Sequence, residues 1–525
     1  MLQVFAASAL VATVALSPVV GLCAPAPSVA TQQGVLLGLQ GGDVTAFLGV
    51  PYAAPPVAAN RWRSPQPAPA WSGVRDARAV GASCPQVRWE PEPPYTAEFD
   101  QRGQTNEDCL FLNIWTPRTT HGRSPVVVFI HGGGFSGGSG GMPLYNGSHL
   151  ASNGVVVVTI NYRLGIFGYL AHPDLSAEDP RHTSGDYGLE DQIAALKWVK
   201  ANIAQFSGDP ANVTIAGESA GAISVNSLII SPDAAGLFAK AVAFSGSGMG
   251  FPAPTLAQAE QRGVQLANRL GARTAAELRA LPLERLLSAD LDPPPGPDGG
   301  LRFSFWPVVD NRILPSDPEG RNSRPQSVVP LMTGFNADEN SSVSVSTIAD
   351  LRRQSAIWFG ASADNILSLY PHATDTEAQA SARLLARDRY MTSLLMWTDA
   401  RAQASGQPIY RYLYDQPSPA WSGRSYGAFH TAGIPYVFGN LDRAARPYGP
   451  KDRAVSNQMQ ARLISFARDG RPGGTGLPAW PVAKPGDGMV MTLGLRPRRR
   501  MAVSTPARFE ALRHFADAGG SLLIF

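Results

Sequence analysis

The amino-acid sequence predicts an α/β fold with a central, mostly parallel sheet that is flanked by helices. Apolar runs rich in β-branched residues occupy residues 126–130, 155–160 and 213–216, and continuous runs of this kind are typical of strands buried on both faces. Residues 189–206 separate the last two runs and carry apolar residues at a period close to 3.6, and residues 220–230 follow as a second helix. Strands that alternate with helices favour right-handed crossovers.

Composition excludes several other classes of protein. With 44% hydrophobic residues in a chain of 525, the sequence can fill a large core, so a disordered chain is excluded. The 44 basic residues nearly balance the 41 acidic ones, so the chain lacks the excess of positive charge that is typical of proteins that bind nucleic acid. Residues 266–286 and 381–403 are helical stretches without strong motifs, which we interpret as excursions over the sheet. We therefore expect residues 31–525 to form a single domain.

The N-terminal segment has most features of a secretory signal peptide. An apolar run over residues 4–16 is too short to span a membrane but long enough for the apolar part of a signal, although no Lys or Arg precedes it. Leu22 disfavours a lipid anchor on Cys23, because a small residue is expected at that position. We predict a signal peptide over residues 1–30, export to the periplasm or the medium, and no stable membrane insertion. Candidate cleavage sites follow Ala24, Ala26 and Ala30.

Removal of this leader would leave two cysteines, Cys84 and Cys109. In an exported chain such a pair is typical of one disulfide that closes a loop, and two unrelated buried thiols are the alternative. No group of Cys and His residues has the spacing of metal ligands. We expect neither a metal nor another cofactor.

The segment Gly217-Glu-Ser-Ala-Gly221 lies between the strand at 213–216 and the helix at 220–230. This context is the one that a nucleophile elbow requires, in which a sharp turn exposes the serine hydroxyl. Side chains at the two glycine positions would clash with the neighbouring strand and helix. Ser219 is therefore the candidate nucleophile.

A glycine run, His131-Gly-Gly-Gly134, directly follows the strand at 126–130. Such a run leaves backbone N–H groups able to point at a developing oxyanion, and it is the expected partner of the elbow in lipases and esterases. A plain tight loop is the alternative interpretation.

The elbow serine needs a base and an orienting acid in the chain order Ser, acid, His. Three histidines follow Ser219 in the chain, namely His372, His430 and His514. Among them, His430 lies in a loop of small residues that would let an imidazole reach a cleft. For the acid, Asp338 and Glu339 follow an apolar run at 328–332, and position alone does not choose between them.

Further blocks in collinear order extend these motifs over nearly the whole chain beyond the leader: 47–53, 107–115, 161–165, 188–192 and 206–210. Together they resemble the type-B carboxylesterases, a branch of the α/β-hydrolases that includes bacterial para-nitrobenzyl esterases, animal carboxylesterases and cholinesterases. The resemblance implies an α/β-hydrolase fold for residues 31–525 with long loops and helical excursions over the active site. It also implies hydrolysis of a small-molecule ester, with water as the second substrate.

The resemblance implies a role for each motif residue. Ser219 would form the acyl-enzyme, His430 would be the general base and later the acid, and Glu339 would orient the imidazole. The N–H groups of the oxyanion hole would come from Gly133, Gly134 and Ala220. Cys84 and Cys109 match the disulfide that closes a loop near the mouth of the family's active-site gorge.

One departure from the family pattern lies next to the expected triad. Gly433 stands where an acidic side chain is common, and that side chain usually supports the site through a serine near position 245. Ser245 is present in this chain, but its carboxylate partner is not. We expect a shifted pH profile or an altered substrate range, and an unchanged pH–rate profile in Gly433→Glu would contradict this expectation.

Two functions other than ester hydrolysis are possible alternatives for such a sequence. A catalytically silent binding module is disfavoured because Ser219, Glu339 and His430 are all present. Hydrolysis of amides or carbamates would use the same residues, so the sequence does not separate it from ester hydrolysis. Neither the natural substrate nor the oligomeric state follows from the sequence.

Overall fold

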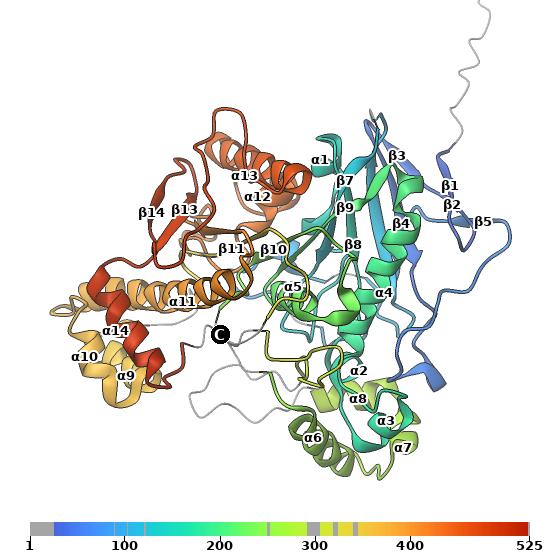
Figure 1. Cartoon of the computed structure of the whole chain (residues 1–525), viewed down its shortest axis with the longest axis horizontal. Coiled ribbons are helices and arrows are strands. Elements are labelled where there is room, and N and C mark those ends of the chain that lie inside the picture. Colours follow the sequence, from blue (N-terminus) through green and yellow to red (C-terminus); the bar gives the residue numbers. More distant parts are fainter. Residues whose placement is uncertain are drawn as a thin grey trace, which may run out of the picture.

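The computed structural model describes residues 26–88, 90–101, 103–119, 122–248, 253–290, 305–318, 324–339 and 345–522. Its centre is a twisted sheet with the strand order β14-β13-β12-β11-β10-β9-β7-β8-β6-β4-β3 (Figure 1). Along this order the neighbours from β8 to β13 are parallel, and the pairs at both ends are antiparallel. The strands are β3 Leu39–Gly41, β4 Val44–Pro51, β6 Phe111–Pro117, β7 Ser124–Ile130, β8 Val156–Ile160, β9 Gly208–Glu218, β10 Lys240–Phe244, β11 Leu331–Asn336, β12 Ile409–Tyr414, β13 Met489–Leu493 and β14 Arg499–Met501.

Helices cover both faces of this sheet and extend beyond it. Those that pack on the sheet include α4 Tyr187–Asn202, α5 Ala220–Ile230, α12 Ile434–Phe438 and α13 Pro450–Asp469. The others are α1 Ser148–Ser152, α2 Gly165–Tyr169, α3 Pro173–Glu178, α6 Leu256–Arg269, α7 Ala275–Arg279, α8 Leu283–Asp290, α9 Ile348–Phe359, α10 Ala363–Leu367, α11 Asp375–Ser405 and α14 Pro506–Asp517. Among the described residues, none of these helices combines the length and the apolar character needed to cross a membrane.

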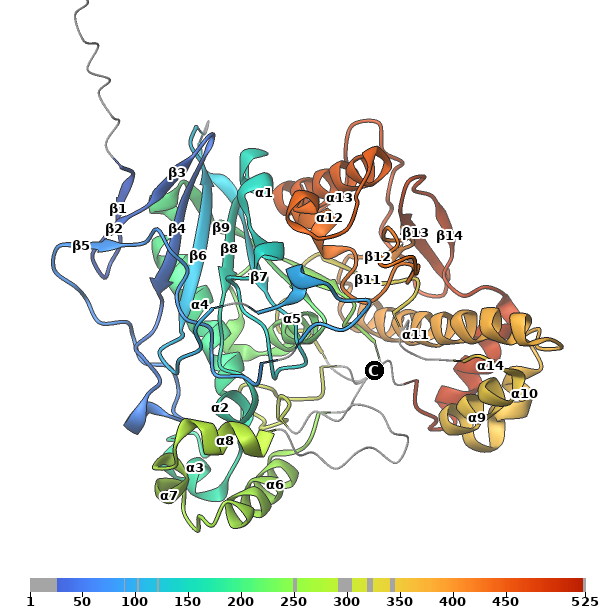
Figure 2. The same ribbon diagram turned by 180° about the vertical axis from the view of Figure 1, so that it is seen from behind.

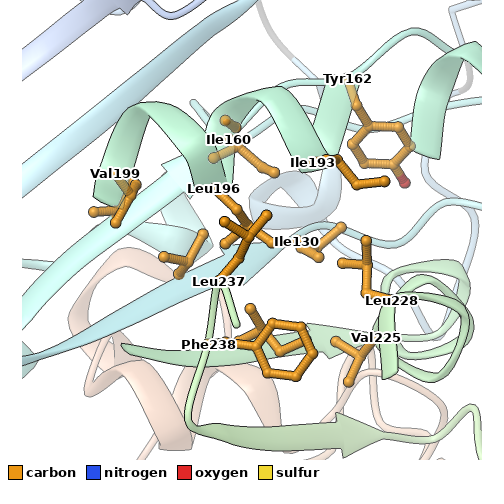
Figure 3. Close-up of a cluster of buried hydrophobic side chains, with 14 of the residues drawn as sticks. Ile130, Ile160, Tyr162, Ile193, Leu196, Val199, Val225, Leu228, Leu237 and Phe238 are labelled. Atoms are coloured by element: carbon orange, nitrogen blue, oxygen red, sulfur yellow. The ribbon is translucent and has the colours of Figure 1, made fainter. Parts of the chain in front are cut away.

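The continuous apolar run of β7 reflects burial on both faces. Val126 and Val128 belong to the core that includes side chains of α4 and α5, part of which is drawn in Figure 3. The alternate residues Val127 and Phe129 belong to the opposite core, which includes side chains of α12 and α13. Because successive side chains of a strand point to opposite faces, a strand between two cores must be apolar at every position.

The carboxyl ends of the central strands meet at one edge of the sheet. Ile130 at the end of β7 is in register with Gly217 near the end of β9. Glu218, the last residue of β9, is in turn in register with Phe244 of β10. The loops after β7, β9 and β10 therefore leave the sheet side by side, at the edge where parallel α/β sheets bind their ligands.

The sequence predictions for these elements are confirmed, with two differences. The helix expected over 189–206 is α4 followed by a 3₁₀ turn at Ile203–Phe206. The helical stretch expected near 266–286 is divided among α6, α7 and α8. Gly271, which adopts a left-handed φ of 74°, follows the end of α6, and Pro282 precedes α8. A left-handed glycine and a proline each interrupt a helix.

The helical excursions gather at two places. In both views α6, α7 and α8 lie together with α3, and α9, α10 and α14 lie at one end of α11 (Figures 1 and 2). A second, small sheet consists of β1 Ser28–Ala30, β2 Val35–Leu37 and β5 Val74–Asp76. Most of the expected leader lies outside the described residues, but β1 falls within its last part.

Candidate active site

Ser219 lies in a strained turn between β9 and α5. Its backbone has φ 56° and ψ −124°, a conformation that a residue with a side chain rarely adopts. A Cβ atom on Gly217 would lie 2.2 Å from the carbonyl oxygen of Gly221, and one on Gly221 would lie 2.1 Å from that of Ile130. The two glycines are therefore required for the turn to pack against the sheet. The turn leaves Ser219 partly exposed between buried neighbours.

The glycine loop after β7 packs directly against this turn. A Cβ atom on Gly132 would lie 3.0 Å from Cβ of Ser219. Gly133 and Gly134 follow with positive φ angles of 104° and 60°, which glycine adopts without steric cost. The structure thus places the two glycines expected to form an oxyanion hole in a loop that touches the candidate nucleophile.

His131 holds the start of the glycine loop. Its ring stacks on Tyr162, with ring centroids 4.5 Å apart, and its Nδ1 lies 2.8 Å from the carbonyl oxygen of Gly132. The Tyr162 hydroxyl donates a hydrogen bond of 2.9 Å to the carbonyl oxygen of His131. Burial lowers the pKa of His131 to about 4, so the ring is neutral at physiological pH and donates from Nδ1.

His430 and Glu339 meet at the ends of two loops. Nδ1 of His430 lies 2.5 Å from Oε2 of Glu339. The other carboxylate oxygen of Glu339 accepts hydrogen bonds from the Ser245 hydroxyl at 2.5 Å and from the N–H of Asn336 at 2.6 Å. With Nδ1 as the donor to Glu339, Nε2 of the neutral imidazole is the proton acceptor.

Asp338, the other candidate acid, has a different role. Its N–H donates to the carbonyl oxygen of Ala428 at 3.0 Å, and its carboxylate accepts from the N–H of Ala428 at 2.9 Å. Gly427 comes so close that a Cβ atom there would lie 2.2 Å from Oδ2 of Asp338. Asp338 therefore joins the acid loop to the loop that carries His430, and it is Glu339 that faces the imidazole.

Glu218, for which the sequence predicted no function, also contacts His430. Its Oε1 lies 3.4 Å from Nε2 of His430 and accepts a hydrogen bond of 2.7 Å from the Thr431 hydroxyl. Burial alone would lower the pKa of His430, but the carboxylates of Glu218 and Glu339 outweigh burial and raise this pKa to about 9. The only sequence signal for Glu218 was its place beside Ser219 in the elbow.

The contact between Glu218 and His430 also shows where the candidate base lies relative to the candidate nucleophile. Glu218 immediately precedes Ser219, so the imidazole of His430 lies beside the elbow turn. The structure thereby brings the turn, the glycine loop and the Glu339–His430 pair together at the carboxyl edge of the sheet. Among the described residues, no cluster of three or more His, Cys, Asp or Glu side chains is arranged to hold a metal ion.

Gly433 lies at the start of α12 beside a small cavity. Its lining includes Glu218, Ser245, Thr431 and Gly433, and its volume of about 10 Å³ is room for about one water molecule. A Cβ atom on Gly433 would lie 3.6 Å from the ring of Tyr414, an ordinary van der Waals contact. A side chain at position 433 would thus lie beside the cavity that Glu218 and Ser245 also line, and the effect of its absence on the pH profile stays a prediction.

Cys84 and Cys109 form a disulfide across a sequence separation of 25 residues. The loop that it closes contains Tyr95, whose ring packs edge-on against Phe429, the residue before His430, with centroids 5.8 Å apart. Burial raises the pKa of Tyr95, and the nearby carboxylates of Glu218 and Glu339 raise it further. The disulfide loop therefore reaches the candidate site.

Comparison with known proteins identifies the family of this chain. A family model described as "Carboxylesterase family" matches residues 25–510. The fumonisin B1 esterase of Sphingopyxis macrogoltabida is 37% identical over 88% of this chain and 86% of its own length. The para-nitrobenzyl esterase of Bacillus subtilis (strain 168) is 35% identical over 86% and 92%, and the phenmedipham hydrolase of Pseudarthrobacter oxydans is 34% identical over 89% and 95%, respectively.

A solved structure titled PNB esterase superposes with a TM-score of 0.76 at 31% identity, covering 92% of this chain and 99% of that one. The superposition confirms the predicted α/β-hydrolase fold, with its large and mostly parallel sheet flanked by helices. The family model and the relatives confirm the resemblance that the sequence motifs indicated. This chain therefore belongs to the carboxylesterase family of enzymes.

Proposed function

We propose that the enzyme hydrolyses carboxylic esters through an acyl-enzyme on Ser219, with His430 as the general base and Glu339 as the orienting acid. The observation that carries this proposal is the 2.5 Å contact between Glu339 and Nδ1 of His430, beside the strained turn that exposes Ser219. Glu339 is itself held by Ser245 and Asn336. A carboxylate fixed in this way keeps Nδ1 protonated and leaves Nε2 to take the serine proton.

The reaction would proceed in two halves. Ser219 attacks the ester carbonyl while Nε2 of His430 accepts its proton, and the same imidazole then protonates the leaving alcohol. Water then attacks the acyl carbonyl while His430 takes a proton from it, and the imidazolium returns this proton to the Ser219 oxygen as the acid product leaves. The negative oxygen of each tetrahedral intermediate would be bound by N–H groups of Gly133, Gly134 and Ala220. Support for this hole comes from the packing of the glycine loop against Ser219.

Active-site labelling and mutation test the nucleophile. Wild-type enzyme should gain the mass of one phosphonate and should hydrolyse a para-nitrobenzyl ester, a substrate chosen because one relative is named for it. Ser219→Ala should lose both properties. Ser227→Ala is a matched control, because Ser227 lies in α5, the helix that follows Ser219, and its hydroxyl bonds only to the carbonyl oxygen of Ile223 among the described groups. Turnover by Ser219→Ala would refute the mechanism.

We also propose that the chain is exported, to the periplasm or the medium. The Cys84–Cys109 disulfide supports export, because disulfides persist in oxidising compartments. Cleavage after Ala24 or Ala26 would preserve β1, whereas cleavage after Ala30 would remove this strand from its pairing with β2. The intact mass of the protein recovered outside the cytoplasm identifies the cleavage site, and recovery of the full-length chain from the cytoplasm alone would contradict export.

A further inference from the structure

The disulfide loop, residues 84–109, is attached to the glycine loop, residues 131–141. Gln86 makes a pair of hydrogen bonds with Gly138: its Nε2 donates to the carbonyl oxygen and its Oε1 accepts from the N–H, both at 2.8 Å. Gln86 is 8% exposed. Because both polar ends of this buried side chain are used on one backbone residue, Gln86 fixes the position of the glycine loop relative to the disulfide loop.

The same loop is attached to the histidine loop, residues 415–430. The guanidinium group of Arg446 donates to the carbonyl oxygen of Pro94 in the disulfide loop and, at 2.8 Å, to that of Pro419 in the histidine loop. It also lies 5.0 Å from the ring centroid of Phe429, the neighbour of His430. Arg446 is 4% exposed, and hydrogen bonds from a buried cation are among the strong ones.

Aromatic packing strengthens this second attachment. Tyr95 and Phe99 of the disulfide loop pack on each other with centroids 5.4 Å apart, and Phe99 lies 6.2 Å from Phe429. Glu98 accepts a hydrogen bond of 3.3 Å from the N–H of Ala445, beside Arg446. The disulfide loop is thus held both by Phe429, next to His430, and by Ala445 and Arg446.

We propose that the disulfide loop fixes the glycine loop and the histidine loop relative to each other, and that Gln86 and Arg446 are positioning residues for catalysis. The inference rests on the proposed function, because the two attached loops carry the oxyanion donors and His430 of that mechanism. The two attachments act in series along this path, so weakening either one loosens the link between the glycine loop and the histidine loop. A displacement of reacting groups by a fraction of an ångström lowers turnover rather than substrate binding.

The structure supplies a matched control for Arg446. Arg462 of α13 is also buried, donates to the carbonyl oxygens of Pro472 and Pro478 at 3.0 and 3.2 Å, and lies 5.2 Å from the ring centroid of Trp480. It therefore repeats the contacts of Arg446 at a place that bears no candidate catalytic residue. Arg446→Met and Arg462→Met remove equivalent interactions, so a purely structural role predicts equivalent effects.

The experiment measures kcat and KM for a small aryl ester, with the concentration of active sites determined by phosphonate titration. Arg446→Met should lower kcat by about tenfold with KM changed by less than about twofold, whereas Arg462→Met should leave kcat unchanged. Equal kcat values for the two variants would overturn the proposal. Failure of the wild-type enzyme to react with the phosphonate would instead refute the proposed function, so the two failures are distinguishable.

A double-mutant cycle with Gln86→Leu tests the series arrangement. Gln86→Leu should also lower kcat, and the loss in Gln86→Leu/Arg446→Met should be smaller than the product of the two single losses, because both substitutions weaken the same link. Losses that multiply in the double variant would overturn the proposal. The substitution of both cysteines, Cys84→Ala/Cys109→Ala, should likewise reduce the loss of kcat that Arg446→Met causes. If that cysteine variant does not fold, the Gln86 cycle decides the question.

Discussion

Replacement of Glu218 by Gln should move the acidic limb of the pH–rate profile to lower pH. In the proposed mechanism the imidazole of His430 must be neutral to accept the proton of Ser219, so the acidic limb reports the pKa of this imidazole. Burial lowers the pKa of His430, but the carboxylates of Glu218 and Glu339 raise it to about 9. Glu218→Gln removes one of these charges while its side-chain oxygen can still accept the hydrogen bond from Thr431.

The size of the effect follows from the 3.4 Å between Oε1 of Glu218 and Nε2 of His430. At this separation two unit charges attract by about 5 kcal/mol at an effective dielectric constant of about 20, and by about 1 kcal/mol in water. One pKa unit corresponds to about 1.4 kcal/mol. The pKa of His430 should therefore fall by about 1 to 3.5 in Glu218→Gln.

The assay is kcat/KM for a small neutral ester as a function of pH, with the active sites titrated by phosphonate. Glu218→Asp, which keeps the charge on a shorter side chain, is the control and should move the acidic limb less than Glu218→Gln does. An acidic limb that stays in place or moves to higher pH in Glu218→Gln would refute the electrostatic reasoning.

Three further substitutions have definite expected outcomes. Ser245→Ala removes one of the hydrogen bonds to the Glu339 carboxylate, a bond of about 2 kcal/mol, so kcat should fall by at most about thirtyfold and the free energy of unfolding by no more than about 2 kcal/mol. Gly221→Ala should destabilise the fold by at least about 2 kcal/mol in urea titration, because its Cβ atom would overlap the carbonyl oxygen of Ile130; a wild-type midpoint would contradict this packing. His131, whose pKa burial lowers to about 4, takes up a proton in the unfolded chain below about pH 6.5 but not in the folded one. The free energy of unfolding should therefore decrease by about 3 kcal/mol as the pH falls from about 6.5 to about 4. His131→Asn should remove this part of the pH dependence, as urea titrations at the two pH values would show.

Features set by local sequence could be predicted before the structure. The elbow around Ser219 and the glycine loop each follow directly on a strand, so their motifs carry their own structural context. Helix α5 was expected at its observed bounds for the same reason. The end of α4 was missed by one turn, because a 3₁₀ turn and an α-helix have nearly the same apolar periodicity over so short a stretch.

Features that depend on tertiary contacts could not be predicted from the sequence. Asp338 and Glu339 are neighbours at the end of one strand, and only the loop packed against them determines which carboxylate faces His430. Arg446 had no sequence signal at all, because its partners Pro94 and Pro419 contribute backbone carbonyl groups that any residue possesses. The family resemblance supplied Glu339 where position alone left the choice open, and the assignment of its role remains a proposal.

The register between β7 and β9 has a consequence for how such an enzyme can change its substrates. Ile130 and Gly217 are neighbours across a single pair of parallel strands, so the glycine loop and the serine turn start one strand spacing, about 4.8 Å, apart. Main-chain hydrogen bonds maintain that spacing, and they do not depend on which side chains line a pocket. If Ser219 and the glycine loop act as proposed, residues that contact the acyl and alcohol groups can be exchanged without a change in the distance between the attacking oxygen and the oxyanion donors. Selection can then alter substrate specificity separately from reactivity.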